Sequence, residues 1–209
     1  CGERIVLGLA LSATAVAMSL GTIIGLLTGY ARRWVDDVVM RVVDIMLSIP
    51  PLIVALLVLG SLGSNAFLII ATVAVLYVPR VTNVIRAATL EVVTEDFVTA
   101  ARLRGESSWS IALRELLPNV IGTVFVEFSL RTGYAVIFIG GLSFLGFGPP
   151  PPTPEWGAMI NEGRSYIEAA PWVVLSPSIG IASVVISLSI FTEGLKSIMG
   201  HSSGRRKET

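Results

Sequence analysis

EDFVTAARLRGESSWSIALRELLP, which spans residues 95–118, is the longest polar segment of an otherwise apolar chain. Its pattern predicts two short helices separated by a glycine. Thr94 is expected to cap the first helix, and Gly105 suits the left-handed turn that stops it. Ser107 or Ser108 is expected to cap the second helix. A compact, charged element of this kind between two apolar segments favours a docking site for a soluble partner.

The composition of the chain predicts a membrane protein. Only 14% of its 209 residues are charged and 53% are hydrophobic, whereas soluble domains average about 25% charged residues. The formal net charge is zero, which argues against a nucleic-acid-binding protein. Cys1 is the single cysteine and His201 the single histidine, so the sequence offers neither a disulfide framework nor a cysteine–histidine metal cluster.

Apolar segments along the chain predict an all-α, polytopic transmembrane bundle with about five spans. A spanning helix needs about 20 mostly apolar residues, and the candidates cover residues 5–31, 42–60, 66–78, 119–148 and 172–192. Pro79 is expected to end the third span. We expect residues 1–200 to form the membrane domain and residues 201–209 a polar cytoplasmic tail. Because the chain starts at Cys1 rather than Met, we expect it to lack an N-terminal piece of the whole protein.

Arginine and lysine predict which side of the membrane each connection faces. If the spans alternate, one side holds most of the basic residues, whereas the other holds Arg4 and Arg164, and Arg131 lies within a span. Cytoplasmic loops carry the excess of basic residues, so the 95–118 element is predicted to be cytoplasmic. The basic residues on that side are Arg32, Arg33, Arg41, Arg80, Arg86, Arg102, Arg104, Arg114, Lys196, Arg205, Arg206 and Lys207.

A stripe of small residues follows one face of the first span. Its members are four residues apart, a spacing that lets helix backbones approach closely in lipid. The stripe predicts either packing within this chain or a seam against a second membrane subunit. It consists of Ala13, Ala17, Gly21, Gly25 and Gly29.

Prolines and charges inside the spans are candidates for the transport pathway. Pro50 and Pro51 interrupt the second span, where proline kinks a helix either structurally or as a hinge. Glu127 and Arg131 are four residues apart in the fourth span. That spacing suits a self-neutralised pair, but charges at membrane depth also mark substrate or proton pathways.

The 95–118 segment resembles the EAA loop of ABC importer permeases, and the likeness covers essentially the whole chain. The family pattern is Glu-Ala-Ala, three residues, glycine, then about a dozen residues that end in Leu-Pro. Thr99 replaces the family's glutamate, and Glu115 stands where the family often has isoleucine or histidine. The residues in register are Thr99, Ala100, Ala101, Gly105, Leu117 and Pro118.

Four further stretches resemble the second permease of the dipeptide, oligopeptide and nickel importers, and the proline-rich one is the most specific. They are WVDDVVMRVVDIMLSIP at 34–50, LSFLGFGPPPPTPEWGAMINEGRSYI at 142–167, APW at 170–172 and FTEGLKSIMG at 191–200. The resemblance implies a multi-pass permease of a bacterial or archaeal inner membrane that carries di- or oligopeptides. Nickel or another small solute is the alternative cargo.

The partners implied by the resemblance are a second, similar permease, two cytoplasmic ATPase subunits and an external substrate-binding protein. The coupling contact with an ATPase would involve Thr99, Ala100, Ala101, Arg102, Gly105, Leu117 and Pro118. ATP and Mg²⁺ would be bound by those partners, since the sequence has no Gly-x-x-x-x-Gly-Lys-Ser/Thr loop. We therefore expect a transport subunit without a catalytic site of its own and with no cofactor.

The outer loop at 149–171 is expected to be either a rigid cap on the pathway or a contact for the binding protein. The candidates for that contact are Glu155, Trp156, Asn161 and Glu162. Taken alone, the residues also leave open a secondary transporter driven by protons or sodium. Its coupling residues would be Asp44, Glu127 and Arg131, but it leaves the 95–118 element unexplained.

Overall fold

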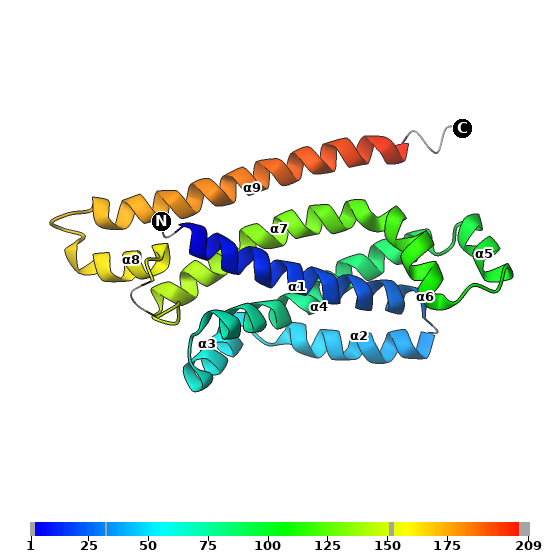
Figure 1. Cartoon of the computed structure of the whole chain (residues 1–209), viewed down its shortest axis with the longest axis horizontal. Coiled ribbons are helices and arrows are strands. Elements are labelled where there is room, and N and C mark those ends of the chain that lie inside the picture. The colour runs from blue at the N-terminus through cyan, green and yellow to red at the C-terminus, as the bar shows by residue number, and fades with distance from the viewer. Residues whose placement is uncertain (1–2, 32, 151–152, 205–209) are drawn as a thin grey trace. The chain divides into compact units, whose positions relative to one another are not determined.

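The structure, a computed structural model, describes residues 3–31, 33–150 and 153–204, and within these ranges every regular element is a helix. The first helices are α1 (Glu3–Tyr30), α2 (Arg33–Ser48), α3 (Pro51–Leu62) and α4 (Ala66–Val92). They are followed by α5 (Asp96–Leu103), α6 (Ser108–Ile111), a π-helical turn (Ala112–Leu116) and α7 (Leu117–Phe144). The last are α8 (Trp156–Gly163), a 3₁₀ turn (Arg164–Tyr166) and α9 (Trp172–Gly204) (Figure 1).

Four described helices are long and apolar enough to cross a membrane, and these are Arg4–Tyr30, Ala66–Val92, Ser108–Phe144 and Trp172–Ser197. A fifth span results if α2 and α3 are counted as one interrupted span. The helical backbone stops at Ser48 and restarts at Pro51, because proline at the start of a helix needs no backbone donor. The second expected span is therefore a broken pair of helices rather than one kinked helix.

Pro79 does not end the third span, as the sequence predicted, because α4 continues through it to Val92. Proline removes one backbone donor, and membrane helices tolerate it where other donors serve the carbonyls left free. The carbonyl that Pro79 leaves without its amide donor is that of Val75, and the Arg80 guanidinium donates to the next carbonyl, that of Leu76, 3.3 Å away. Arg80 and Arg86 consequently belong to a helix and not to the connecting loop in which the sequence placed them.

The chain divides into two compact units, and α1, α4 and α7 each contribute residues to both. The second unit covers residues 16–49 and 75–128. Its seam is the close approach of the α1 glycines to α4. A Cβ on Gly25 would lie 2.9 Å from the Ile85 Cβ, and one on Gly29 would lie 2.7 Å from the Thr89 Cβ. The glycines of the stripe therefore pack within this chain, which was one of the two arrangements predicted from the sequence.

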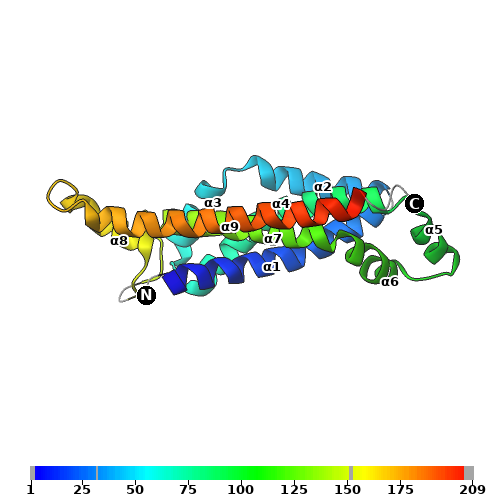
Figure 2. The same ribbon diagram turned by 90° about the horizontal axis from the view of Figure 1, so that it is seen from above.

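The first unit covers residues 1–15, 50–74 and 129–209. Here α8 packs against α9, and Figures 1 and 2 both show the two helices side by side. Gly180 of α9 makes room for the Trp156 indole, whose Cζ2 atom would lie 3.0 Å from an added Cβ. Helix α9 extends to Gly204 and includes the first residues of the expected tail, whereas residues 205–209 lie outside the described part of the chain.

Candidate functional site

Helix α5 and the turn that follows it form the polar element predicted from the sequence. Glu95 occupies the N-cap position without a side-chain hydrogen bond. The predicted cap, Thr94, instead donates its hydroxyl to the carbonyl of Glu91, 3.2 Å away, because the preceding helix α4 runs on to Val92. Gly105 has φ +77°, the left-handed conformation that glycine adopts at no steric cost, so the predicted helix stop is confirmed.

One face of α5 anchors it to the second unit. Val98 and Ala101 are fully buried. They join an apolar core made by α1, α4, α6, the π-helical turn and α7. The buried members of this core are Met18, Leu26, Val81, Ile85, Val98, Ala101, Ile111, Ala112, Leu116 and Val120. Ala101 therefore holds the helix in place, and the direct partner contact predicted for it is not available because the side chain points inward.

The opposite face of α5 is exposed and presents Asp96, Thr99, Ala100 and Leu103 at helical spacing. Thr99 and Ala100 are exposed, and Leu103 is 84% exposed, the highest value among the large apolar side chains of the described residues. Sequence reasoning missed Leu103. The available signal was its spacing of four from Thr99 and three from Ala100, which places all three on one helical face. An apolar side chain this exposed beside small residues suits insertion into a groove on another protein.

Arg102 ties α5 to the end of α1. Its Nε donates to the Tyr30 hydroxyl at 3.3 Å, and its guanidinium carbon lies 4.7 Å from the centre of the Tyr30 ring. A cation over an aromatic face contributes about 0.5–1 kcal/mol at an exposed site. The family resemblance implied a contact between Arg102 and an ATPase, and within this chain Arg102 contacts Tyr30.

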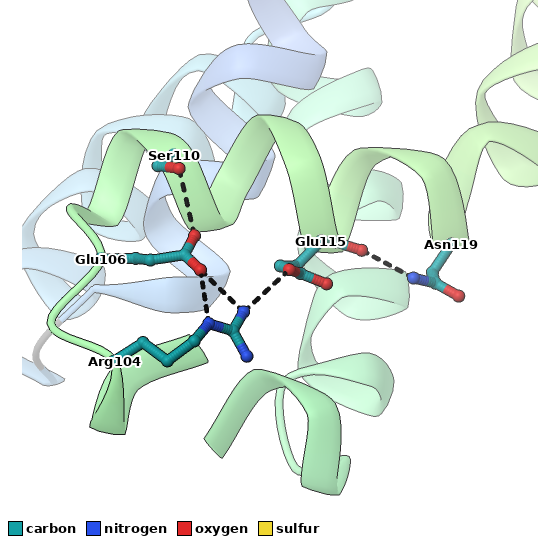
Figure 3. A network of polar contacts seen from close by, with 5 residues as sticks. All are labelled: Arg104, Glu106, Ser110, Glu115 and Asn119. Atoms are coloured by element: carbon teal, nitrogen blue, oxygen red, sulfur yellow. Dashed lines mark hydrogen bonds and ion pairs between the residues drawn. The ribbon is translucent and has the colours of Figure 1, made fainter. Parts of the chain in front are cut away.

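A polar network closes the turn between α5 and α6 (Figure 3). Arg104 donates to Glu106 Oε1 from Nε at 2.9 Å and from Nη2 at 2.7 Å, and Nη2 also reaches Glu115 Oε1 at 3.4 Å. The Ser110 hydroxyl donates to Glu106, and Ser107 caps α6, as predicted, by accepting from the Ser110 amide. The Arg104 guanidinium is the main reason why the pKa of Glu106 is lowered.

The π-helical turn carries the chain past Pro118 without a break. The sequence predicted that Pro118 would separate the second short helix from the next span, but the helix is continuous over Ser108–Phe144. In the widened turn the Leu117 amide donates to the Ala112 carbonyl, five residues earlier. The Asn119 side chain donates to the Glu115 carbonyl at 2.6 Å. These bonds serve backbone groups beside a residue that lacks an amide hydrogen.

A partly buried charge pair that the sequence did not reveal joins α2 to α4. Arg86 donates Nε and Nη2 to the two carboxylate oxygens of Asp36. A two-point contact between guanidinium and carboxylate is the strongest form of such a pair, and it neutralises a cation that lies within a span. Because the partners are 50 residues apart in sequence, no local spacing predicts their meeting.

The candidate pathway residues occupy α7 and the interruption after α2. Glu127 is buried, and the Arg131 guanidinium carbon lies 5.9 Å from the centre of the Tyr134 ring. Pro50 precedes α3 and Pro51 is its first residue. A role for these residues in the pathway stays a prediction.

The four residues predicted to contact a binding protein differ in how far they are exposed. Glu155 is 1% exposed, so the direct contact with a binding protein predicted for it lacks a surface. Burial raises the pKa of Glu155 to about 7, and the Ser143 hydroxyl lowers it by a smaller amount. Asn161 and Glu162 line a cavity of about 600 Å³, and Glu162 is exposed. Trp156 is half-buried against α9.

Comparison with known proteins finds relatives along most of the chain. Residues 21–201 match a family described as binding-protein-dependent transport system inner membrane component. The chain is 36% identical to the glutathione transport system permease protein GsiD of Pectobacterium atrosepticum, over 93% of this chain and 65% of that protein. It is 33% identical to the dipeptide transport system permease protein DppC of Alkalihalophilus pseudofirmus, over 93% of this chain and 64% of that protein.

Solved structures share the fold at low sequence identity. A chain from the MetNI methionine ABC transporter in an inward-facing conformation is 17% identical, with a TM-score of 0.71 over 93% of this chain and 94% of that one. A chain from an amino acid ABC transporter is 20% identical, with a TM-score of 0.62 over 96% of this chain and 92% of that one. The fold is therefore that of ABC importer permeases, and the chain spans just under two thirds of the length of each of the two curated relatives named above.

Proposed function

Because this chain belongs to the family of binding-protein-dependent transport system inner membrane components, we propose that it is a permease subunit of an ATP-driven importer of peptides. It is a multi-pass protein of the inner membrane, as its family and its apolar helices require. The proposed cargo is a di- or oligopeptide, since GsiD and DppC are named for glutathione and dipeptides. Nickel or another small solute is the alternative cargo.

The proposed site of coupling is the exposed face of α5. The observation that carries this proposal is the two-sided character of the helix: Val98 and Ala101 are fully buried, whereas Leu103 is 84% exposed. A groove on a cytoplasmic ATPase subunit would receive Leu103 together with Ala100 and Thr99. Because the buried face is fixed to the core of the second unit, a displacement of α5 by the ATPase would move that core with it.

The remaining partners follow from the same proposal. A second, similar permease would complete the pathway, two ATPase subunits would bind ATP and Mg²⁺, and an external protein would deliver the cargo. On α9 the apolar side chains of Ile179 and Ile190 are exposed in the isolated chain, and lipid or the second permease would cover them. Trp156, Asn161 and Glu162 remain the proposed contacts for the binding protein.

Leu103→Asp tests the coupling proposal in the assembled transporter. A charged side chain cannot enter an apolar groove without losing its hydration, so uptake of labelled dipeptide or glutathione should fall by roughly tenfold or more, as for an interface hot spot. The permease should still insert into the membrane, because Leu103 supports no core contact. Thr94→Asp, which adds the same charge at an exposed position just before α5, is the matched control and should transport normally.

Normal uptake by Leu103→Asp, with the complex intact, would remove α5 as the coupling site. The cargo is tested in vesicles that contain the unaltered transporter and its cognate binding protein, by comparing the uptake of dipeptide, glutathione and nickel. Uptake of nickel alone would contradict the peptide assignment and leave the coupling proposal standing.

A further inference from the structure

Glu155 is a fully enclosed carboxyl group at the junction of α7 and α8. It is 1% exposed, and neither of its oxygens makes a well-formed hydrogen bond, although the nearby Ser143 hydroxyl is close enough to lower its pKa slightly. Glu155 occupies the N-cap position of α8 without accepting a side-chain hydrogen bond from it. Since an ionised carboxylate is costly away from water, burial favours the neutral form of a group in this setting.

Two glycines press the start of α8 against the end of α7 around this carboxyl. A Cβ on Gly148 would lie 2.7 Å from Glu155 Oε2, and one on Gly157 would lie 2.7 Å from Ser143 Cβ and 3.0 Å from the Phe144 amide nitrogen. Real Cβ atoms essentially never approach other atoms within 3.0 Å. The two glycines therefore allow close packing around Glu155, which lines a cavity of about 600 Å³ but is only 1% exposed.

The charges that face Glu155 do not favour its ionised form. Glu155 lines the cavity together with residues from the end of α7, the 145–150 segment and the turn at Ser64, and those lining residues are uncharged. The described titratable group that shares the cavity is Glu162 of α8. An ionised Glu155 that moved into this cavity of about 600 Å³ would meet water and the like charge of Glu162.

We propose that Glu155 is a proton-binding site whose neutral form latches the start of α8 to the end of α7, and whose ionisation releases α8. The two states are a docked one with a neutral, buried carboxyl and a released one with a charged carboxylate in the cavity. Under the orientation predicted from the basic residues, this junction faces outside, so the latch would respond to the pH of the external medium.

The direction of the pH dependence follows from the pKa values of the two states. Burial raises the pKa of Glu155 from 4.5 to about 7 in the docked state. The docking of α8 is fully favoured below pH 4.5. It weakens as the pH rises from 4.5 to about 7, and above pH 7 it stays at this weaker level. The difference between the two pKa values corresponds to a change in the docking equilibrium on the order of a hundredfold.

Thiol labelling at Ala158, a half-buried residue that lines the cavity, tests the latch in the assembled transporter. Ala158→Cys is introduced in a Cys1→Ser background, with and without Glu155→Gln, and the labelling rate is measured from pH 5 to pH 8. Dividing the rate with Glu155 by the rate with Glu155→Gln at each pH removes the ionisation of the thiol itself. We expect this ratio to rise about tenfold or more, and we expect Glu162→Gln to leave the rise in place.

A ratio that stays constant across the pH range would overturn the proposal. If Glu155→Gln does not assemble, the rate at Ala158→Cys is divided instead by that at Ile167→Cys, a position that is already exposed in the following loop. A rise centred between pH 4.5 and 7 then supports the latch, and parallel rates at the two positions contradict it.

Discussion

Close approach of α1 to α4 is possible only because three residues of α1 have no side chain. At Gly21, Gly25 and Gly29 an added Cβ would come within 2.9 Å of a side-chain atom of α4. Without a hydrophobic driving force between helices in lipid, such contact is what holds two helices together. The seam is part of the unit that carries α5, so its rigidity bears directly on the proposed coupling.

Gly25→Leu should therefore weaken the protein. The new side chain meets the Ile85 Cβ and the Thr82 carbonyl, each 2.9 Å from its first carbon, and we expect a loss of about 1–3 kcal/mol, as for an overpacked core. Gly8→Leu lies on the same helix with nothing within 4 Å and is the matched control. Thermal unfolding of the detergent-solubilised protein measures both. Equal melting temperatures for the two variants would contradict the claim that close contact between α1 and α4 stabilises the protein.

Individual residues differ in how far the sequence could place them. The four-residue spacing of the small stripe was sufficient to predict a helix seam, because periodicity reports which face a residue occupies. Glu155 lies in a proline-rich segment with no period, and nothing in that sequence distinguishes a buried glutamate from an exposed one. The Arg86–Asp36 pair depends on how α2 and α4 meet, which neither helix encodes by itself.

At the scale of elements, the turn between α5 and α6 is held by charge rather than by apolar packing. Arg104 joins Glu106, which follows the glycine, to Glu115 in the π-helical turn. Figure 2 shows α5 and α6 next to each other, connected by this turn. An exposed ion pair contributes little singly, and here two such pairs link the glycine turn to the π-helical turn while the buried face of α5 anchors the helix.

The network predicts that acid loosens this turn. Because the pKa of Glu106 is lowered, chiefly by its hydrogen bond from Arg104, its contribution is present above the ordinary range of glutamate and is lost as the pH falls through the lowered value. Hydrogen exchange at the amides of residues 107–110, corrected for intrinsic rates, should therefore speed up on acidification. Arg104→Ala should remove most of that dependence, whereas Arg164→Ala, an exposed arginine of the other unit, should not. Identical pH profiles for all three proteins would contradict the role of the network.

The helices differ from their predicted ends at two prolines. Pro50 does interrupt the second span, but Pro79 and Pro118 both lie inside continuous helices. The rule that proline ends a helix assumes that the freed carbonyl finds no other donor. Here the Arg80 and Asn119 side chains donate to the Leu76 and Glu115 carbonyls beside the prolines, and a π-helical turn precedes Pro118. Contacts of this kind depend on the neighbouring turns and cannot be predicted from the proline alone.

For the whole molecule, the composition and the apolar segments predicted a helical membrane protein with about five spans, and the described residues contain four helices long and apolar enough to span, or five if the bent pair counts as one. Resemblance in the 95–118 and 142–167 segments predicted the family, which the match over residues 21–201 confirms. What the sequence could not assign is which side of α5 faces outward. That distinction needs the core formed with α1, α4 and α7, since it is their side chains that cover Val98 and Ala101.

The most direct measurement is crosslinking from α5 in membranes that contain the complete transporter. Leu103→Cys, at an exposed position, and Val98→Cys, at a buried position on the same helix, are compared with the same bifunctional reagent in a Cys1→Ser background. We predict that Leu103→Cys captures the ATP-hydrolysing subunit and that Val98→Cys does not. If Leu103→Cys never captures that subunit in vesicles that still import cargo, α5 is not the element through which the motor acts.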